Sequence, residues 1–183
     1  MSQTGLNSYM RFLKGEQNAL EYFVRAYSDP LTRYAYCYVG DIGLAEDVME
    51  EAFATLIVRR KHFEDEAHLQ AYLYKVARNK SIDVLRKRKR EVSLSDVEEV
   101  LSCCDAQSNV IRDSLNQQIY ICMQQLPAQY KEVLYLSYFE DFSNEEVCHL
   151  MKKSKKQVYN LLSRARVALK EIFIMEGITY EDL

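Results

Sequence analysis

The chain has 183 residues and a net charge of −3 at pH 7, and this bulk charge argues against a protein that coats DNA without specificity. Five glycines and two prolines are few for this length, so the composition favours helices over strands joined by turns. No apolar run is long enough to cross a bilayer, and the N-terminus lacks the basic start and apolar stretch of a signal peptide, so we expect a cytoplasmic protein without membrane insertion.

Residues 6–90 are predicted to form a first helical domain. Asp29 and Pro30 indicate that a new helix starts there, because Asp is a favourable cap and Pro is tolerated at the first helical position. Before this point, an apolar stripe at helical spacing indicates one buried helix face, formed by Leu20, Phe23, Val24 and Tyr27.

Two further helices of this domain are predicted over residues 44–60 and 67–88. Gly40 and Gly43 separate the first of them from the preceding helix, and the polar stretch 62–66 is predicted to be a loop between the two. The residues expected to face the core are Val48, Phe53, Leu56, Ile57, Leu69, Leu73, Val76 and Ala77.

Charge is segregated along the chain. Residues 41–51 carry five acids and no base, whereas residues 151–170 carry seven Lys or Arg and no acid. A second basic segment covers residues 78–90. This pattern predicts that one face of the protein binds a polyanion and that another face binds a different partner.

Residues 91–108 are predicted to be a flexible acidic linker, since Ser and acidic residues outnumber the apolar ones. The five cysteines include no CxxC pair, which indicates reduced thiols and no metal site. Cys103 and Cys104 lie side by side in this linker, and the sequence leaves open whether they have a redox role.

Residues 109–176 are predicted to form a second helical domain that contains a helix-turn-helix. Pro127 indicates the start of a helix, and Tyr138 is expected to be one of the residues of this helix that face the core. Ser143 and Ser154 each have Glu or Gln three residues later, which is the capping-box pattern at a helix start. Two capped helices joined by a short turn at 152–153 indicate a helix-turn-helix, and the second helix is basic, as a helix in a major groove would be.

These motifs resemble those of a known family. Residues 126–134, 142–147 and 154–166 resemble region 4 of bacterial sigma factors, and residues 45–53 with 71–86 resemble region 2. Two such domains joined by a short linker are similar to the extracytoplasmic-function (ECF, group 4) class over nearly the whole chain. The resemblance implies an all-α protein that binds core RNA polymerase and directs it to promoter DNA, with no catalytic residue, cofactor or small-molecule substrate.

The resemblance also implies site residues. For recognition and melting of the −10 element it implies Lys61, His62, Phe63, Tyr72, Asn79, Asp83, Arg86 and Arg90. For the −35 element it implies Ser154, Lys155, Lys156, Tyr159, Asn160 and Arg164. For binding core polymerase it implies Glu46, Asp47, Glu50, Glu51 and Phe53. A regulatory anti-sigma factor is expected as a further partner.

Alternatives remain open for several of these residues. Phe63 and Tyr72 are equally compatible with core packing, and part of the basic run 86–90 is compatible with a solvated helix end. The position of Asn79 in the middle of a predicted helix favours a functional role for it, because Asn is a poor helix former. Lys152 or Lys153 stands where the family usually has a turn glycine, which predicts a less standard turn.

Two other functions compete with the hypothesis that the protein is a sigma factor. A response-regulator type of DNA-binding protein shares the C-terminal helix-turn-helix but would dimerise on palindromic sites. A helical adaptor that binds only protein would be indifferent to DNA and salt, whereas a protein that places Lys and Arg on phosphates loses DNA affinity as salt rises.

Overall fold

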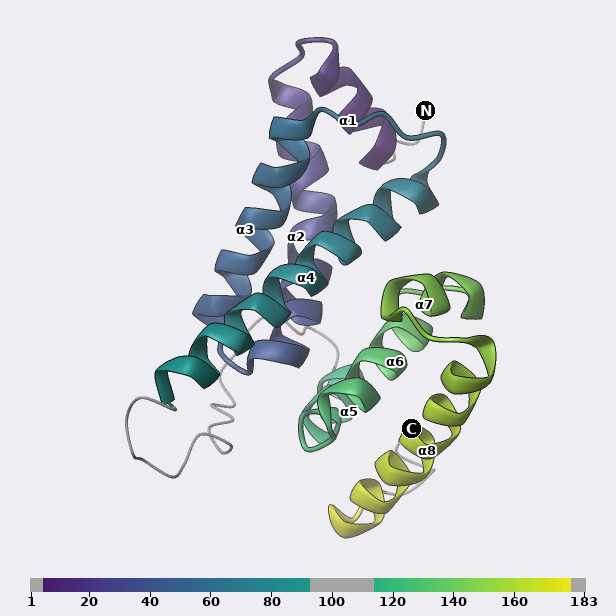
Figure 1. Cartoon of the computed structure of the whole chain (residues 1–183). Helices are drawn as coiled ribbons and strands as arrows, with labels where there is room; N and C mark the ends of the chain where they lie inside the picture. The colour runs from purple at the N-terminus through teal and green to yellow at the C-terminus, as the bar shows by residue number, and fades with distance from the viewer. Residues whose placement is uncertain (1–4, 93–113, 179–183) are drawn as a thin grey trace. The chain divides into compact units, whose positions relative to one another are not determined.

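The computed structural model describes residues 5–92 and 114–178, with side chains described over 5–90 and 118–178. Every regular element in these ranges is an α-helix, as the composition predicts. The helices fall into two compact units, α1–α4 and α5–α8 (Figure 1). Most of the predicted linker 91–108, with Cys103 and Cys104, lies outside the described residues. No helix in the described chain is long and apolar enough to span a bilayer.

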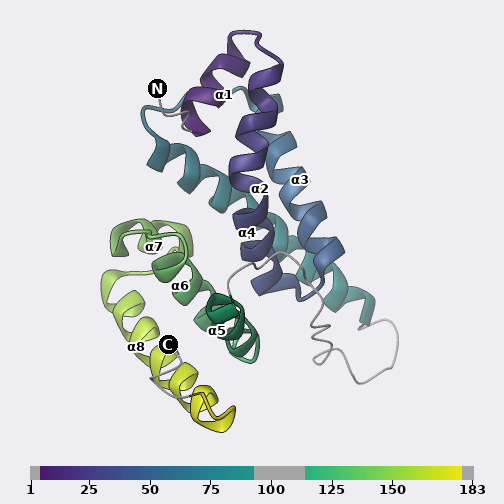
Figure 2. The same ribbon diagram turned by 180° about the vertical axis from the view of Figure 1, so that it is seen from behind.

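The first unit is built around α2. Its helices are α1 (Gly5–Leu13), α2 (Asn18–Val39), α3 (Ile42–Arg59) and α4 (Glu66–Val92). Helix α2 packs against the other three, and α3 also packs against α4. Figures 1 and 2 show α2 and α3 side by side, with α4 crossing them and α1 at one end.

The predicted helix start at Asp29 is wrong, because α2 continues through Pro30. A proline inside a helix removes one backbone hydrogen bond and costs about 3 kcal/mol. Here Phe23, Tyr27 and Leu31 lie four residues apart and are all buried, so one uninterrupted helix buries one continuous stripe. The buried area on both sides of Pro30 outweighs the lost bond. Helix α2 ends where predicted, at Gly40 in the left-handed conformation with φ of 64°.

Aromatic rings dominate the core of the first unit. Phe23 lies 5.3 Å from Tyr9 and 5.5 Å from Phe53, measured between ring centroids. Each pair of rings meets at an angle rather than face to face, the arrangement that aromatic quadrupoles prefer. Of the residues predicted to face inward, Ile57 and Val76 are half-buried and the others are buried: Val48, Phe53, Leu56, Leu69, Leu73 and Ala77.

The second unit packs three helices against α8. Its helices are α5 (Ser114–Gln124), α6 (Ala128–Tyr138), α7 (Asn144–Met151) and α8 (Lys155–Met175). The core includes Leu134, Leu136, Val147, Leu150, Val158 and Leu162.

Tyr138 was predicted to lie in this core but is 53% exposed. It is the last residue of α6, so the packed part of the helix ends before its ring is covered. Its ring instead receives the Arg166 guanidinium, whose carbon lies 5.4 Å from the ring centroid.

Candidate nucleic-acid interfaces

Two capping boxes set the geometry of the helix-turn-helix, as the sequence predicts. The Ser143 hydroxyl accepts from the Glu146 N–H at 3.3 Å, and the Glu146 carboxylate accepts from the Ser143 N–H at 2.8 Å. Ser154 and Gln157 make the equivalent pair at the start of α8, at 3.3 and 2.8 Å. Both helices therefore begin at defined residues, which orients α8 relative to α7.

The turn between the two helices contains Lys152 in the left-handed conformation, with φ of 53°. The Lys152 N–H donates to the Cys148 carbonyl, and the Lys153 N–H donates to the same oxygen at 3.0 Å. A left-handed residue is where glycine is favoured, so Lys152 is the residue that replaces the expected turn glycine. The backbone adopts the usual geometry of a helix end, although the Cβ of Lys152 makes the left-handed conformation less favourable than it would be for glycine.

Helix α8 separates its side chains into two faces. Val158, Leu162 and Ala165 are buried, and Leu161 is half-buried. The six residues predicted for the −35 element are all exposed: Ser154, Lys155, Lys156, Tyr159, Asn160 and Arg164.

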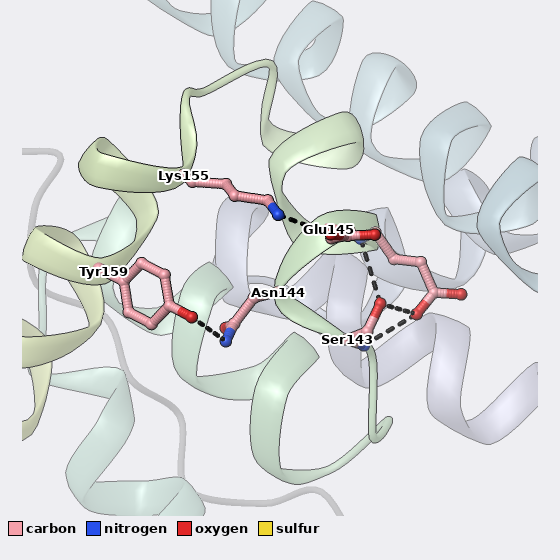
Figure 3. Close-up of polar contacts among 6 residues, drawn as sticks. Ser143, Asn144, Glu145, Lys155 and Tyr159 are labelled. Carbon is pink, nitrogen blue, oxygen red and sulfur yellow. Dashed lines mark hydrogen bonds and ion pairs between the residues drawn. The ribbon is translucent and has the colours of Figure 1, made fainter.

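Side chains of α7 hold two of these exposed residues (Figure 3). The Asn144 side-chain nitrogen donates to the Tyr159 hydroxyl at 3.3 Å, and Lys155 Nζ lies 2.6 Å from a Glu145 carboxylate oxygen. The hydrogen bond and charge of Lys155 lower the pKa of Glu145, and Glu145 raises the pKa of Lys155 for the same reasons. Asn144 and Glu145 were not among the predicted site residues, because both contacts cross the turn and follow no helical spacing rule.

A cation and two aromatic rings gather at the connection between α3 and α4. The Phe63 and Tyr72 rings lie 5.4 Å apart, and Lys61 Nζ lies 5.3 and 4.8 Å from their centroids. Both rings are half-buried, while Lys61 and His62 are exposed. Phe63 and Tyr72 thus pack against their neighbours and still reach the surface, which is compatible with both alternatives considered for them.

The other residues predicted for the −10 element lie along α4. Asn79, Asp83, Arg86 and Arg90 are exposed and recur every three or four residues, which places them on one stripe of the helix. Arg86 pairs with Asp83 at 3.4 Å. Arg88, by contrast, turns back toward the domain and donates to the Val39 carbonyl at 3.4 Å.

The acidic side chains of α3 form an exposed surface, but Phe53 does not belong to it. Glu46, Asp47, Glu50 and Glu51 are exposed, and Glu51 pairs with Lys80 of α4 at 2.7 Å. The Phe53 side chain is buried against Phe23, so the position grouped with the polymerase-binding residues supports α3 from inside the core.

Within residues 5–90 and 118–178, no group of three His, Cys, Asp or Glu side chains is placed to hold a metal ion. Cys37 and Cys122 are buried, and Cys148 is half-buried.

Comparison with known proteins agrees with this architecture. The family model for sigma-70 region 2 matches residues 23–91, and the model for sigma-70 region 4 matches residues 116–169. The ECF RNA polymerase sigma factor SigM of Bacillus subtilis is 31% identical, over 80% of this chain and 90% of SigM. SigW, an ECF sigma factor of the same organism, is 26% identical over 86% of this chain and 90% of SigW.

A solved structure shares the fold. The sigma factor RpoE of Bartonella quintana, in complex with the anti-sigma factor NepR, superposes with a TM-score of 0.70 at 23% identity. The match covers 84% of this chain and 96% of that one.

Two helical units that match regions 2 and 4 of sigma-70, with an exposed basic helix after the turn of the second, define a transcription initiation factor. The chain belongs to the family of ECF RNA polymerase sigma factors. It is a sigma factor for RNA polymerase, a DNA-binding specificity subunit that does not itself catalyse a reaction.

Proposed function

We propose that this sigma factor recognises the −35 element in the major groove with the exposed face of α8. The observation that carries the proposal is the α8 N-terminus: a capped start, two exposed lysines, and Tyr159, Asn160 and Arg164 on the following turns. Lysines and helix N–H groups suit phosphates, and side chains on the next turns of a recognition helix suit base edges. Val158 and Leu162 pack this helix on its other side.

The −10 element is assigned to the α3–α4 loop and the exposed stripe of α4. Melting requires an unpaired base to leave the stack, at a cost of a few kcal/mol that stacking on aromatic side chains offsets. Phe63 in the loop and Tyr72 on α4 supply half-buried rings, and Lys61 supplies a cation beside them. Asn79 has both a donor and an acceptor for a base edge, and Arg86 and Arg90 suit the phosphates that follow.

Core RNA polymerase is assigned to the acidic surface of α3. Glu46, Asp47, Glu50 and Glu51 are exposed over little more than one turn of the helix, which favours a basic partner surface. The pairing of Glu51 with Lys80 ties this surface to α4, the helix assigned to the −10 element. The corresponding division of the chain is residues 6–90, a linker over 91–108 and residues 109–176.

An anti-sigma factor is the proposed regulatory partner, and the cytoplasm, where RNA polymerase works, is the proposed site of action. Bartonella RpoE has been solved in complex with NepR, an anti-sigma factor. A partner that covers the acidic face of α3 and the basic face of α8 would block the polymerase and DNA surfaces together. Copurification from the native host tests this, and recovery of core polymerase without any second small protein would count against it.

Reconstituted transcription tests the function as a whole. The protein is added to core RNA polymerase from a related bacterium, and transcripts from fragmented host DNA are mapped. Discrete start sites that require the protein would support the proposal and would identify both promoter elements. Binding to duplex DNA as a dimer without core polymerase would favour the regulator alternative, and insensitivity to DNA and salt would favour the adaptor.

A further inference from the structure

The N-terminal helix α1 lies against the connection between α3 and α4, which is the loop assigned above to the −10 element. In Figure 1 this connection runs across α1 before α4 begins, and Figure 2 shows the same elements together from behind. None of the predicted site residues lies in α1. Three contacts attach α1 to the two ends of the loop.

The first contact involves the start of the loop. The Tyr9 hydroxyl donates to the Lys61 carbonyl at 2.9 Å, and the Tyr9 side chain is fully buried. The Tyr9 ring also lies 6.0 Å from the Phe63 ring. One buried side chain therefore positions both the backbone at Lys61 and the aromatic ring that we assign to base stacking.

The second contact involves the end of the loop. Glu66, the first residue of α4, accepts from the Leu6 N–H at 2.7 Å and from the Tyr27 hydroxyl. The Glu66 carboxylate thus satisfies an unpaired N–H in the first turn of α1. The approach is so close that a Cβ on Gly5 would lie 2.7 Å from a Glu66 carboxylate oxygen and 2.3 Å from the Tyr27 ring, so a larger residue there would displace these side chains.

The third contact comes from Arg60, which ends α3 in the left-handed conformation with φ of 46°. Its guanidinium donates to the Leu13 carbonyl at the end of α1, at 2.8 Å. The three attachments therefore lie along the length of α1: the backbone N–H of Leu6 in the first turn, the side chain of Tyr9 in the middle and the backbone carbonyl of Leu13 at the end. They hold residues 60, 61 and 66, so both ends of the short loop are tied to the same rigid element.

We propose that α1 is a bracket that presets the conformation of the 61–65 loop, and that Tyr9 is a positioning residue for recognition of the −10 element. The inference rests on the assignment of this loop to the −10 element. Tyr9 is buried and so acts on DNA only through Lys61 and Phe63. A loop held in its binding conformation does not lose conformational freedom when the base enters, and its contacts distinguish bases more sharply than those of a loose loop.

The test compares Tyr9→Phe with the native protein as holoenzymes, on promoters that differ by single −10 bases. The variant keeps the ring packing and removes only the hydroxyl. We expect the ratio of opening rates between the best base and the others to fall roughly 2- to 10-fold, the range that one net hydrogen bond supplies. Affinity for core polymerase should be unchanged. Tyr22→Phe removes an exposed hydroxyl from α2 and serves as the matched control.

Arg60→Gln supplies a second variant, which is informative even if Tyr9→Phe fails to fold, because Arg60 is exposed. The loss of the Arg60 charge weakens phosphate binding equally on every promoter with an altered −10 base, so this effect cancels in the ratio of opening rates. A smaller fall in discrimination is expected. Unchanged discrimination in the folded variants, or an equal loss of polymerase binding, would overturn the role of the bracket.

Phe63→Ala separates this inference from the assignment on which it rests. If Phe63→Ala lowers base discrimination and the bracket variants do not, the loop recognises the −10 element without help from α1. If Phe63→Ala and Asn79→Ala also leave discrimination unchanged, the assignment of the loop fails, and the inference fails with it.

Discussion

Asn144 and Tyr159 are joined across the turn of the helix-turn-helix, where the Asn144 amide donates to the Tyr159 hydroxyl at 3.3 Å. Tyr159 is 56% exposed, and it lies on the face of α8 assigned to the −35 element. The hydrogen bond selects one orientation for a ring that would otherwise move freely in solvent. The helix that precedes the recognition helix therefore takes part in presenting it.

Asn144→Ala is expected to weaken binding to the −35 element by about 2- to 10-fold, because a net hydrogen bond contributes roughly 0.5–1.5 kcal/mol. Fluorescence anisotropy with a duplex that contains only the −35 element measures this. A double-mutant cycle with Tyr159→Phe isolates the coupling. Additive effects would mean that Asn144 contacts DNA on its own account and does not orient Tyr159.

Glu145→Gln is expected to raise affinity for the same duplex. Glu145 places a negative charge 2.6 Å from Lys155 at the start of α8, and its removal leaves Lys155 available to a phosphate. One additional phosphate contact would steepen the dependence of log K on log salt by about 0.9. Glu171→Gln makes the same change in charge near the other end of α8 and is the matched control. Equal gains in both variants would show that only net charge matters.

Asn79→Ala is expected to slow promoter opening while it leaves polymerase binding unchanged. Alanine is the better helix former by roughly 0.5 kcal/mol, and Asn79 is exposed on α4, so the variant should be at least as stable as the native protein. Opening assays with permanganate footprinting, together with urea unfolding, check both quantities. Parallel losses of stability and polymerase binding would indicate that Asn79 is structural.

Lys152→Gly is expected to raise the free energy of unfolding by about 0.5–1 kcal/mol. A non-glycine residue in the left-handed conformation costs roughly 1–2 kcal/mol, and glycine relieves this while it increases the freedom of the unfolded chain. Lys153→Gly is the control, because this substitution removes the same charge at a residue that does not have a positive φ. An equal rise in the free energy of unfolding of Lys153→Gly would show that the effect comes from the loss of charge.

The free energy of unfolding is expected to fall between pH 10 and pH 12 through Tyr9. Burial raises the pKa of Tyr9 to about 12, with a smaller contribution from Tyr72, whereas an unfolded tyrosine has a pKa of about 10. The unfolded chain therefore loses this proton first, and stability that is complete below pH 10 is lost as the pH rises through the folded value. Two pH units correspond to about 3 kcal/mol.

Tyr9→Phe lacks this titration, so its stability should converge on that of the native protein as the pH rises. Urea unfolding of both proteins at several pH values measures the difference, and the other tyrosines cancel in the comparison. A constant difference across this range would show that Tyr9 titrates normally.

Local features of the fold were predicted where a few neighbouring residues decide them. Both capping boxes follow from side chains that form hydrogen bonds with the backbone three positions away. The helix end at Gly40 follows from the ease with which glycine adopts the left-handed conformation, and the turn at Lys152 lies between the two capped helices. The sigma-factor family was predicted on the same basis, since its motifs are short runs on single helices, and the comparisons confirm it. The site residues assigned from those motifs stay predictions.

The errors arose where distant residues decide the outcome. Pro30 has the local chemistry of a helix start, but burial of the α2 stripe on both sides keeps the helix continuous. Tyr138 continues the apolar pattern of its helix, but it is the last residue of α6 and is 53% exposed, because the packing of the helix ends before its ring is covered.

The sequence by itself determined the family, the helices and their capped ends, because these depend on contacts between residues a few positions apart. Only the tertiary structure decided which side chains hold the two candidate DNA-binding surfaces in place. Tyr9 meets Lys61 across 52 positions and Leu6 meets Glu66 across 60. Asn144 and Glu145 meet α8 on the far side of a turn. Such contacts form only after the helices have packed, so no local pattern in the sequence predicts them.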